Sequence, residues 1–289
     1  MADLYTRIAT KKQLDLSQYK LRHAQEEDYD TLISEPTVIY EPGNAEPKIV
    51  YLLLQEDNSA LIKALQTIDY KLEIRTGGMM AQSRTVGFLP RNTLRRDYCT
   101  ATSCYVEHPD EHDIIVSYAA KVAHYYQEFA PLLYQQHMEM TEKVLENWKI
   151  DESVFTSGIV NKNNPLPYHF DAGNFRDVWS NMIVLKRNVL GGYLAVPEYG
   201  LGFELRNNSL LMFDGQNILH GVTPITQLEQ DSFRYSIVYY SMQQMWKCLP
   251  PRDEIERIQR FRLEREEERM QRQLTGERFD PTKKTRRTK

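Results

Sequence analysis

Three histidines of this chain are followed two residues later by a carboxylate, a spacing that can place two metal ligands side by side. The pairs are His108–Asp110, His137–Glu139 and His169–Asp171. Chance alone also produces such pairs, so the local structure decides which of them can bind an ion.

Only His169 and Asp171 lie in a segment whose geometry suits a metal. Side chains two residues apart point the same way on a strand, whereas on a helix they lie on different faces. Asp110 stands at a predicted helix start, where a carboxylate stabilises the first turn, and His137 lies within a predicted helix. His169 and Asp171 follow a strand-like run. They can therefore converge on one ion.

His220 provides a third ligand just beyond another strand-like run. Two histidines and one carboxylate form the facial triad of non-haem Fe(II) oxygenases, which leaves coordination positions open for a co-substrate and O₂. Structural zinc is instead closed by four ligands, usually including cysteine. We therefore expect His169, Asp171 and His220 to be the metal ligands of a catalytic iron site.

Arg234 and Ser236 follow in the last strand-like run, at positions that share one strand face. A buried arginine is costly unless it pairs with an anion, and its fork of N–H donors matches a carboxylate. We expect this pair to bind the distal carboxylate of 2-oxoglutarate.

The elements around these residues are mostly strands. Runs with strand character, separated by turn residues, cover 155–160, 179–185, 193–197, 202–205, 209–213 and 233–241. Many short strands of this kind indicate a sandwich, a barrel or a jelly roll. Before them, residues 112–149 have helical periodicity, which Pro131 divides into two helices.

The two ends of the chain differ from this core. We expect short strands at 37–40 and 48–54 and a helix from Asn58 or Ser59 to about Asp69. Residues 252–274 form a predicted helix in which basic and acidic residues alternate. The predicted organisation is an N-terminal α/β extension packing on the core (1–75), a core with supporting helices (76–249), the charged helix (250–275) and a basic flexible tail (276–289).

Composition excludes several classes of protein. With 289 residues, 41% hydrophobic and 26% charged, the chain is long enough for a globular core. Its three cysteines are sparse, odd in number and without a CxxC pair, which argues against a disulfide scaffold or a zinc ribbon. The sequence shows no signal segment and no membrane span. We expect a monomer in the cytoplasm, with no membrane partner.

The site motifs and their surroundings resemble the 2-oxoglutarate/Fe(II) dioxygenases with a double-stranded β-helix, a jelly-roll fold. More narrowly, residues 157–174, 191–200, 211–215 and 219–225 resemble the TET/JBP branch, and in particular its compact phage-type members. The likeness extends back to residues 83–91 and 95–99. It implies a double-stranded β-helix core. With the supporting helices and the charged C-terminal helix predicted above, we expect an α+β protein with a mainly β core. The cysteine-rich zinc-binding region of the animal members is absent.

The resemblance also implies an activity and its cofactors. Enzymes of this branch use Fe(II), 2-oxoglutarate and O₂ to oxidise the methyl group of a pyrimidine in DNA. For this chain we expect hydroxylation of 5-methylcytosine to 5-hydroxymethylcytosine, with further oxidation left open, in the host cytoplasm if a phage encodes it. The ligand and arginine roles carry over to His169, Asp171, His220 and Arg234, and less directly to Ser236.

A base within a duplex has to be flipped out to reach such a site. Side chains that could read or stack on it are Asn161, Asn163, Asn174, Phe88 and Tyr168. The net charge is −4, so DNA needs a local basic surface. Residues 76–98 look turn-rich and basic, and we expect Arg84, Arg95 and Arg96 to grip phosphates there.

Three alternatives stay open on the sequence. The enzyme could hydroxylate thymine in DNA, or a protein side chain or small molecule. The third alternative is a catalytically silent DNA-binding domain, which the survival of all three ligands and Arg234 disfavours.

Overall fold

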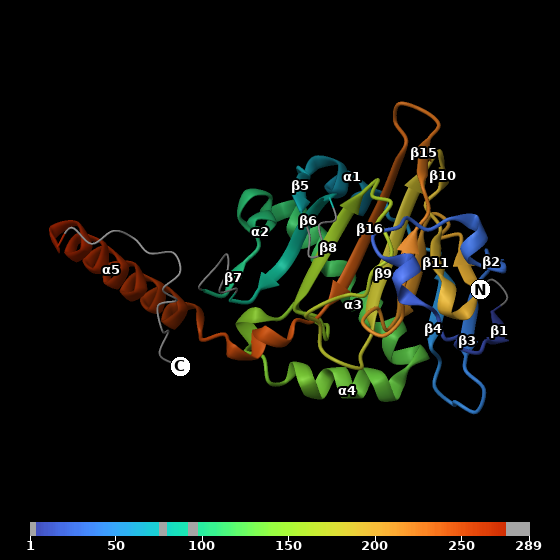
Figure 1. Ribbon diagram of the computed structural model, residues 1–289, viewed down its shortest axis with the longest axis horizontal. Helices are drawn as coiled ribbons and strands as arrows, with labels where there is room; N and C mark the ends of the chain where they lie inside the picture. Colours follow the sequence, from blue (N-terminus) through green and yellow to red (C-terminus); the bar gives the residue numbers. More distant parts are fainter. Residues whose placement is uncertain (1–3, 75–79, 92–97, 276–289) are drawn as a thin grey trace.

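One large sheet dominates the protein. The computed structural model describes residues 4–74, 80–91 and 98–275. Within them, strands join in the order β1-β3-β4-β13-β9-β16-β8-β6-β5, with β7 paired to β6 (Figure 1). In that order they are Tyr5–Ile8, Thr37–Tyr40, Ile49–Leu53, Ser209–Phe213, Ser180–Arg187, Phe233–Tyr240, Ser157–Lys162, Met80–Leu89 and Lys71–Ile74, with β7 at Thr100–Ala101.

A second, smaller sheet has the strand order β14-β11-β12-β2. Its strands are Gly221–Val222, Leu194–Val196, Leu201–Phe203 and Thr31–Ile33, and a separate ladder joins β10 (Val189–Gly191) to β15 (Ile225–Gln227). Apolar side chains from both sheets form one cluster, including Val184, Leu211, Val196 and Phe203. The two sheets therefore pack against each other, as in a jelly roll.

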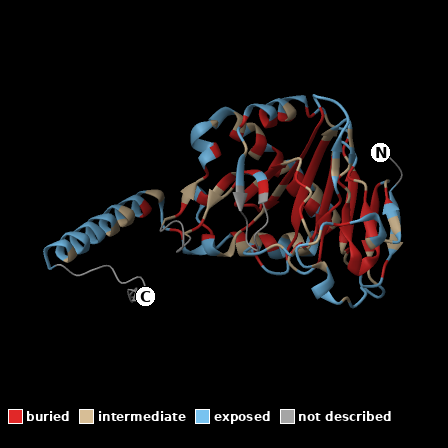
Figure 2. Ribbon diagram, turned by 45° about the horizontal axis from the view of Figure 1, so that its top comes forward, coloured by how far each residue is buried: buried red, intermediate tan, exposed pale blue. Residues whose placement is uncertain are grey.

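The large sheet has two differently covered faces, because successive strand residues point to opposite sides. One face meets the small sheet. The other carries residues such as Val160, Ile183 and Ile237 and packs against helices through Leu65 and Tyr126. Figure 2 shows that most residues of the central strands are buried. Throughout, we call these the small-sheet face and the helix face.

The helices are α1 to α5, at Ser59–Thr67, Ser103–Glu107, Pro109–Phe129, Pro131–Thr141 and Pro251–Thr275. Short 3-10 helices lie at Leu16–Tyr19, Glu26–Asp28, Glu146–Trp148, Pro197–Tyr199 and Gln243–Lys247. Pro131 ends α3 and begins α4, since proline suits a first helical turn but not a helix interior. The predicted break is confirmed, although α4 stops at Thr141, short of the predicted end at residue 149. No helix among the described residues combines the length and the apolar character needed to cross a membrane.

The prediction of a turn-rich loop at residues 76–98 is wrong for the part of this range that the structure describes, which is 80–91 and residue 98. Met80–Leu89 form the ten-residue strand β6, which pairs with β5 and β8. Ser83 and Arg84, which lie within the predicted loop, are buried strand residues. Arg95 and Arg96 lie outside the described residues.

Cys99 and Cys248 form a disulfide, which the sparse cysteine set did not lead us to expect. The bond joins the segment after β6 to the segment before α5. Glu254 of α5 reinforces this junction by accepting hydrogen bonds from the backbone N–H groups of Cys99 and Leu249 and pairing with Arg91. Beyond this base, α5 extends away from the sheets and its surface is exposed (Figures 1 and 2).

Candidate active site

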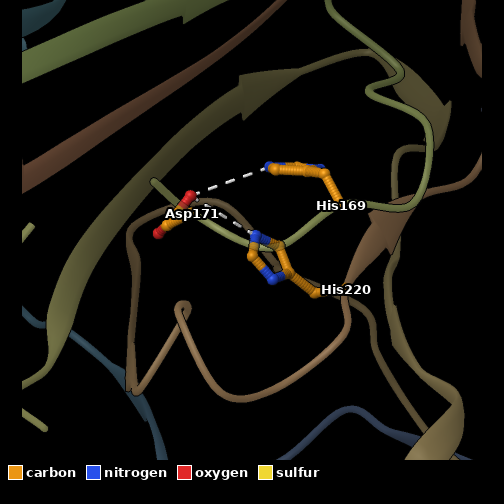
Figure 3. Close-up of side chains that lie close together, drawn as sticks. All are labelled: His169, Asp171 and His220. Atoms are coloured by element: carbon orange, nitrogen blue, oxygen red, sulfur yellow. Dashed lines mark ion pairs between the residues drawn. The ribbon is translucent and has the colours of Figure 1, made fainter. Parts of the chain in front are cut away.

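Three side chains converge at the edge of the small-sheet face (Figure 3). The Nε2 atoms of His169 and His220 lie 3.8 and 3.9 Å from Oδ1 of Asp171. A backbone bridge between His169 and His220 holds the two histidine segments together. All three ligand atoms lie within 4.8 Å of one another. A single ion can therefore bind all three.

Backbone carbonyl groups orient both imidazole rings. Nδ1 of His169 lies 2.8 Å from the carbonyl oxygen of Pro167, and Nδ1 of His220 lies 3.0 Å from that of Ile218. A ring that donates its Nδ1–H to a carbonyl has a bare lone pair on Nε2. Both rings are thus set to present Nε2 to a metal beside Asp171.

Asp171 is fixed by the loop after β13 and by β9. Its backbone N–H donates to Gly215, and its Oδ2 accepts a 3.1 Å hydrogen bond from Ser180 Oγ. Asn174 Nδ2 donates in turn to Ser180 Oγ at 3.0 Å. A Cβ at position 215 would lie 2.3 Å from Oδ2, so glycine is needed for this close approach. One carboxylate oxygen is held by the protein, while Oδ1 faces the two histidines.

Arg234 lies on the small-sheet face of β16 and is 1% exposed. Its Nε and Nη2 have no hydrogen-bond partner among the described residues, and burial lowers its pKa to about 10. Gly192 makes room for it, because a Cβ there would lie 2.7 Å from Nε. Buried donors are rarely left unpaired. The site thus fits an anion with two oxygens, such as the distal carboxylate of 2-oxoglutarate.

Polar side chains continue this face across the neighbouring strands. Ser236 pairs in register with Asn161, and Asn161 with Ser83 on β6. Asn161 Nδ2 donates to Ser236 Oγ at 3.4 Å, and Ser83 Oγ is buried without a partner among the described residues. Asn163 has a different role, since it accepts a 2.7 Å bond from the backbone N–H of Arg234 at a turn with φ of 51°.

Of the residues predicted to contact the base, the structure places only some close to the proposed metal ligands and Ser236. Asn174 reaches them through Ser180, and Asn161 lies beside Ser236. Phe88 packs against Tyr105 and Trp148 instead. Tyr168 is 4% exposed, covered by Tyr19 and bonded to Asp28. The Tyr168 ring is thus covered by the fold, and the half-buried Phe88 ring packs with two other aromatic rings.

The phosphate grip predicted for Arg84 does not fit its position. Its guanidinium lies on the helix face of β6, is 3% exposed and pairs with Asp69 and Glu107. Both acids belong to the fold, so Arg84 is not available to DNA.

The other two histidine–carboxylate pairs do not form comparable sites. His137 is buried on α4 between Phe155 and Phe175 and bonds Ser241, while Glu139 is exposed. His108 bonds Asp69, next to Glu107. These three ligand-type residues cluster, but Arg84 already neutralises both acids.

Comparisons with known proteins agree with this geometry. Residues 91–243, more than half of the chain, match the Tet_JBP family, described as the oxygenase domain of the 2OGFeDO superfamily. "Bifunctional helicase and thymine dioxygenase JBP2" of Trypanosoma brucei brucei is 34% identical over 116 residues, covering 40% of this chain and 10% of that protein. The Trypanosoma cruzi protein of that name is 23% identical over 231 residues, covering 76% and 21%.

A solved structure, NgTET1 in complex with 5mC DNA, has a TM-score of 0.54 at 13% identity and covers 84% of this chain and 83% of its own. This likeness confirms the predicted jelly-roll fold. The chain spans only 10% and 21% of the two curated relatives, so it corresponds to a part of them. The family match, the fold and the converging ligands together show that the chain belongs to the TET/JBP family of 2-oxoglutarate/Fe(II) dioxygenases.

Proposed function

We propose that this protein hydroxylates the methyl group of a 5-methylpyrimidine base in DNA, and that the base is 5-methylcytosine. One observation carries the chemistry. The small-sheet face presents three converging metal ligands and a buried guanidinium, two of whose donors have no partner among the described residues. Membership of the family makes Fe(II), 2-oxoglutarate and O₂ the expected reactants.

His169, Asp171 and His220 would hold Fe(II), and Arg234 with Ser236 would hold the distal carboxylate of 2-oxoglutarate. When bound, the iron and the 2-oxo acid supply the O₂ activation that inserts one oxygen atom into a methyl C–H bond. The protein positions the reactants and excludes water from the site. Burial of His220 and Arg234, 6% and 1% exposed, keeps water from the ligands and the anchor.

Ser180 keeps Asp171 in place for this reaction. Its hydroxyl holds Oδ2, which leaves Oδ1 directed at the two imidazoles. Outer partners of metal ligands typically change metal affinity or activity 10- to 100-fold. We infer that Ser180 and Asn174 are positioning residues rather than contacts to the base.

DNA as the substrate is supported by the relatives and not by a contact in this chain. The two trypanosome proteins are named thymine dioxygenases, and NgTET1 was solved with DNA that contains 5mC. Our preference for 5-methylcytosine rests on the resemblance of residues 157–174 and 191–200 to the phage-type TET-like members. Thymine is the second candidate, and the names of the sequence relatives favour it.

Nucleoside mass spectrometry tests the proposal. The purified chain is incubated with Fe(II), 2-oxoglutarate, ascorbate and DNA that contains both 5-methylcytosine and thymine, and the digest is searched for one added oxygen. We expect 5-hydroxymethylcytosine. Detection of oxidised thymine instead would show that thymine is the substrate, and the proposed methyl hydroxylation would stand. Succinate release with neither base altered would point to a protein or small-molecule substrate.

A further inference from the structure

Lys186 lies directly opposite Arg234 in the antiparallel pairing of β9 and β16. Residues paired in this way project from the same sheet face, so both cations point to the small-sheet face. Like charges directly opposite each other destabilise a sheet. This position therefore has a cost that another group has to offset.

No acid of the described residues forms an ion pair with either cation. Lys186 Nζ donates one 3.3 Å bond to the backbone carbonyl of Glu204 and lies 5.9 Å from the centre of the Tyr193 ring. Burial, and then the charge of Arg234, lower the pKa of Lys186, while the more distant Glu204 carboxylate opposes this shift. The ammonium group has three donors, and only this one hydrogen bond joins it to the described residues, so the half-buried group can also bind a ligand.

One turn encloses both cations. Gly192 lies against Arg234 Nε, as a Cβ at this position would be 2.7 Å away, and the next residue is Tyr193, whose ring lies by Lys186. Arg234 keeps two unpaired donors here. A buried guanidinium, a half-buried ammonium group beside it and no ion-paired acid among the described residues are the features of a site built for an anionic group.

We propose that Lys186 is a second anchor for the distal carboxylate of 2-oxoglutarate, beside Arg234, and that it selects dicarboxylic 2-oxo acids over those with a neutral tail. This inference rests on the proposed function, because it assigns a residue to the same co-substrate. A strongly hydrated ammonium and a planar guanidinium contact a carboxylate from different directions, so the two cations are complementary.

Equilibrium binding of the co-substrate tests the inference without turnover. The full chain, loaded with Fe(II) under anaerobic conditions, is titrated calorimetrically with 2-oxoglutarate and separately with 2-oxobutyrate, which lacks the second carboxylate. We expect Lys186→Met to weaken 2-oxoglutarate about tenfold, equal to about 1.4 kcal/mol, and to leave 2-oxobutyrate unchanged.

Lys162→Met is the matched control. Lys162 is on the adjacent strand β8, but it is paired with Tyr235 and lies over Tyr70 on the helix face. We expect it to bind both ligands as the unaltered protein does. Lys186→Gln, which keeps a donor for the Glu204 carbonyl, replaces Lys186→Met if that variant does not fold.

The outcomes separate this inference from the proposed function. If the unaltered chain does not bind 2-oxoglutarate, the proposed function fails and the inference with it. If the unaltered chain binds and the Lys186 variants match it, only the inference is wrong. An equal loss for both ligands would also overturn it, because Lys186 would then act on the metal site or the fold. Unchanged co-substrate affinity with weaker DNA binding would assign Lys186 to DNA instead.

Discussion

Two buried arginines on opposite faces of one sheet have opposite surroundings. Arg84 on the helix face is 3% exposed and pairs with the carboxylates of Asp69 and Glu107. Arg234 on the small-sheet face is 1% exposed and keeps two donors without a partner among the described residues. The fold supplies two acids to the first guanidinium, which keeps only its Nε without a partner among the described residues, and supplies none to the second.

This difference separates a structural charge from a binding charge. A buried ion needs compensation, because leaving water costs several kcal/mol. On the helix face the compensation is part of the chain, so it is present in every state of the folded protein. On the small-sheet face it must come from a ligand. A buried arginine is therefore informative about function only when its acid partners are sought first.

Removal of a metal ligand should give the largest difference between the two faces. We expect Asp171→Ala to reduce turnover by more than the ~100-fold typical of outer-shell partners, because one of three ligands is lost. Glu139→Ala, from the equally spaced pair on α4, should leave turnover unchanged. Succinate release and base oxidation measure both, and a matching Tm shows that the fold persists. Full activity of the Asp171 variant would refute the proposed triad.

Substitution of the two arginines should have opposite effects on co-substrate binding and on stability. Arg234→Met should raise the KM for 2-oxoglutarate about 10- to 100-fold, since hydrogen bonds to a charged group are worth about 1.5–3 kcal/mol. Its free energy of unfolding should not fall, because no ion pair is broken. Arg84→Met should lower the free energy of unfolding by about 1–3 kcal/mol and leave KM unchanged.

Chemical denaturation and steady-state kinetics of these two variants make the comparison. If the Arg234 variant lost stability and kept its KM, Arg234 would be a structural charge after all. A raised KM in the Arg84 variant would place that residue nearer to the site than its ion pairs indicate.

Ser180→Ala sharpens the contrast within the small-sheet face itself. Loss of the hydroxyl that holds Asp171 should weaken Fe(II) binding about tenfold. Ser209→Ala is the control, since Ser209 is a buried serine of the neighbouring strand β13 that pairs with Val184, at the other end of the pairing from Ser180. Titration with Fe(II) under anaerobic conditions compares them, and equal affinities would remove Ser180 from the site.

The buried His137 of α4 should make the stability of the fold depend on pH. Burial lowers the pKa of His137 from 6.5 to about 3. Below pH 6.5 this imidazole therefore binds a proton in the unfolded chain but stays neutral in the folded chain. Stability is therefore present above pH 6.5 and lost as pH falls, by about 2 kcal/mol at pH 5. His137→Gln should flatten the fall in Tm between pH 7.5 and pH 5, whereas His124→Gln, exposed on α3, should not. An unchanged slope in the His137 variant would contradict this assignment.

Periodic patterns in the sequence predicted much of the core. The runs 37–40 and 209–213 coincide with β3 and β13, and the helices on either side of Pro131 follow from apolar spacing. Strand β6 was missed because Gln82, Ser83 and Arg84 are polar and Gly87 interrupts the run. Their burial depends on partners elsewhere in the chain. Strands β14 and β15, of two and three residues, were also missed.

The same distinction holds for the site: local spacing predicted some of its residues, whereas others depend on parts of the chain that are distant in sequence. A strand period of two places His169 beside Asp171, so spacing was enough to predict that pair. Ser180, Gly215 and Gly192 were not among the predicted site residues, because their roles exist only once loops far apart in sequence meet. Likewise, a cysteine count reveals nothing about the distance between Cys99 and Cys248.

The disulfide makes the chain between these two cysteines a covalently closed ring. Its ends are 149 residues apart, and every proposed contact to iron and 2-oxoglutarate lies on it. A single proteolytic nick in a surface loop, such as the turn before β16, would therefore leave one molecule, not two fragments. Whether a nicked enzyme can keep its metal and co-substrate contacts together would depend on the thiol state of two residues that touch neither.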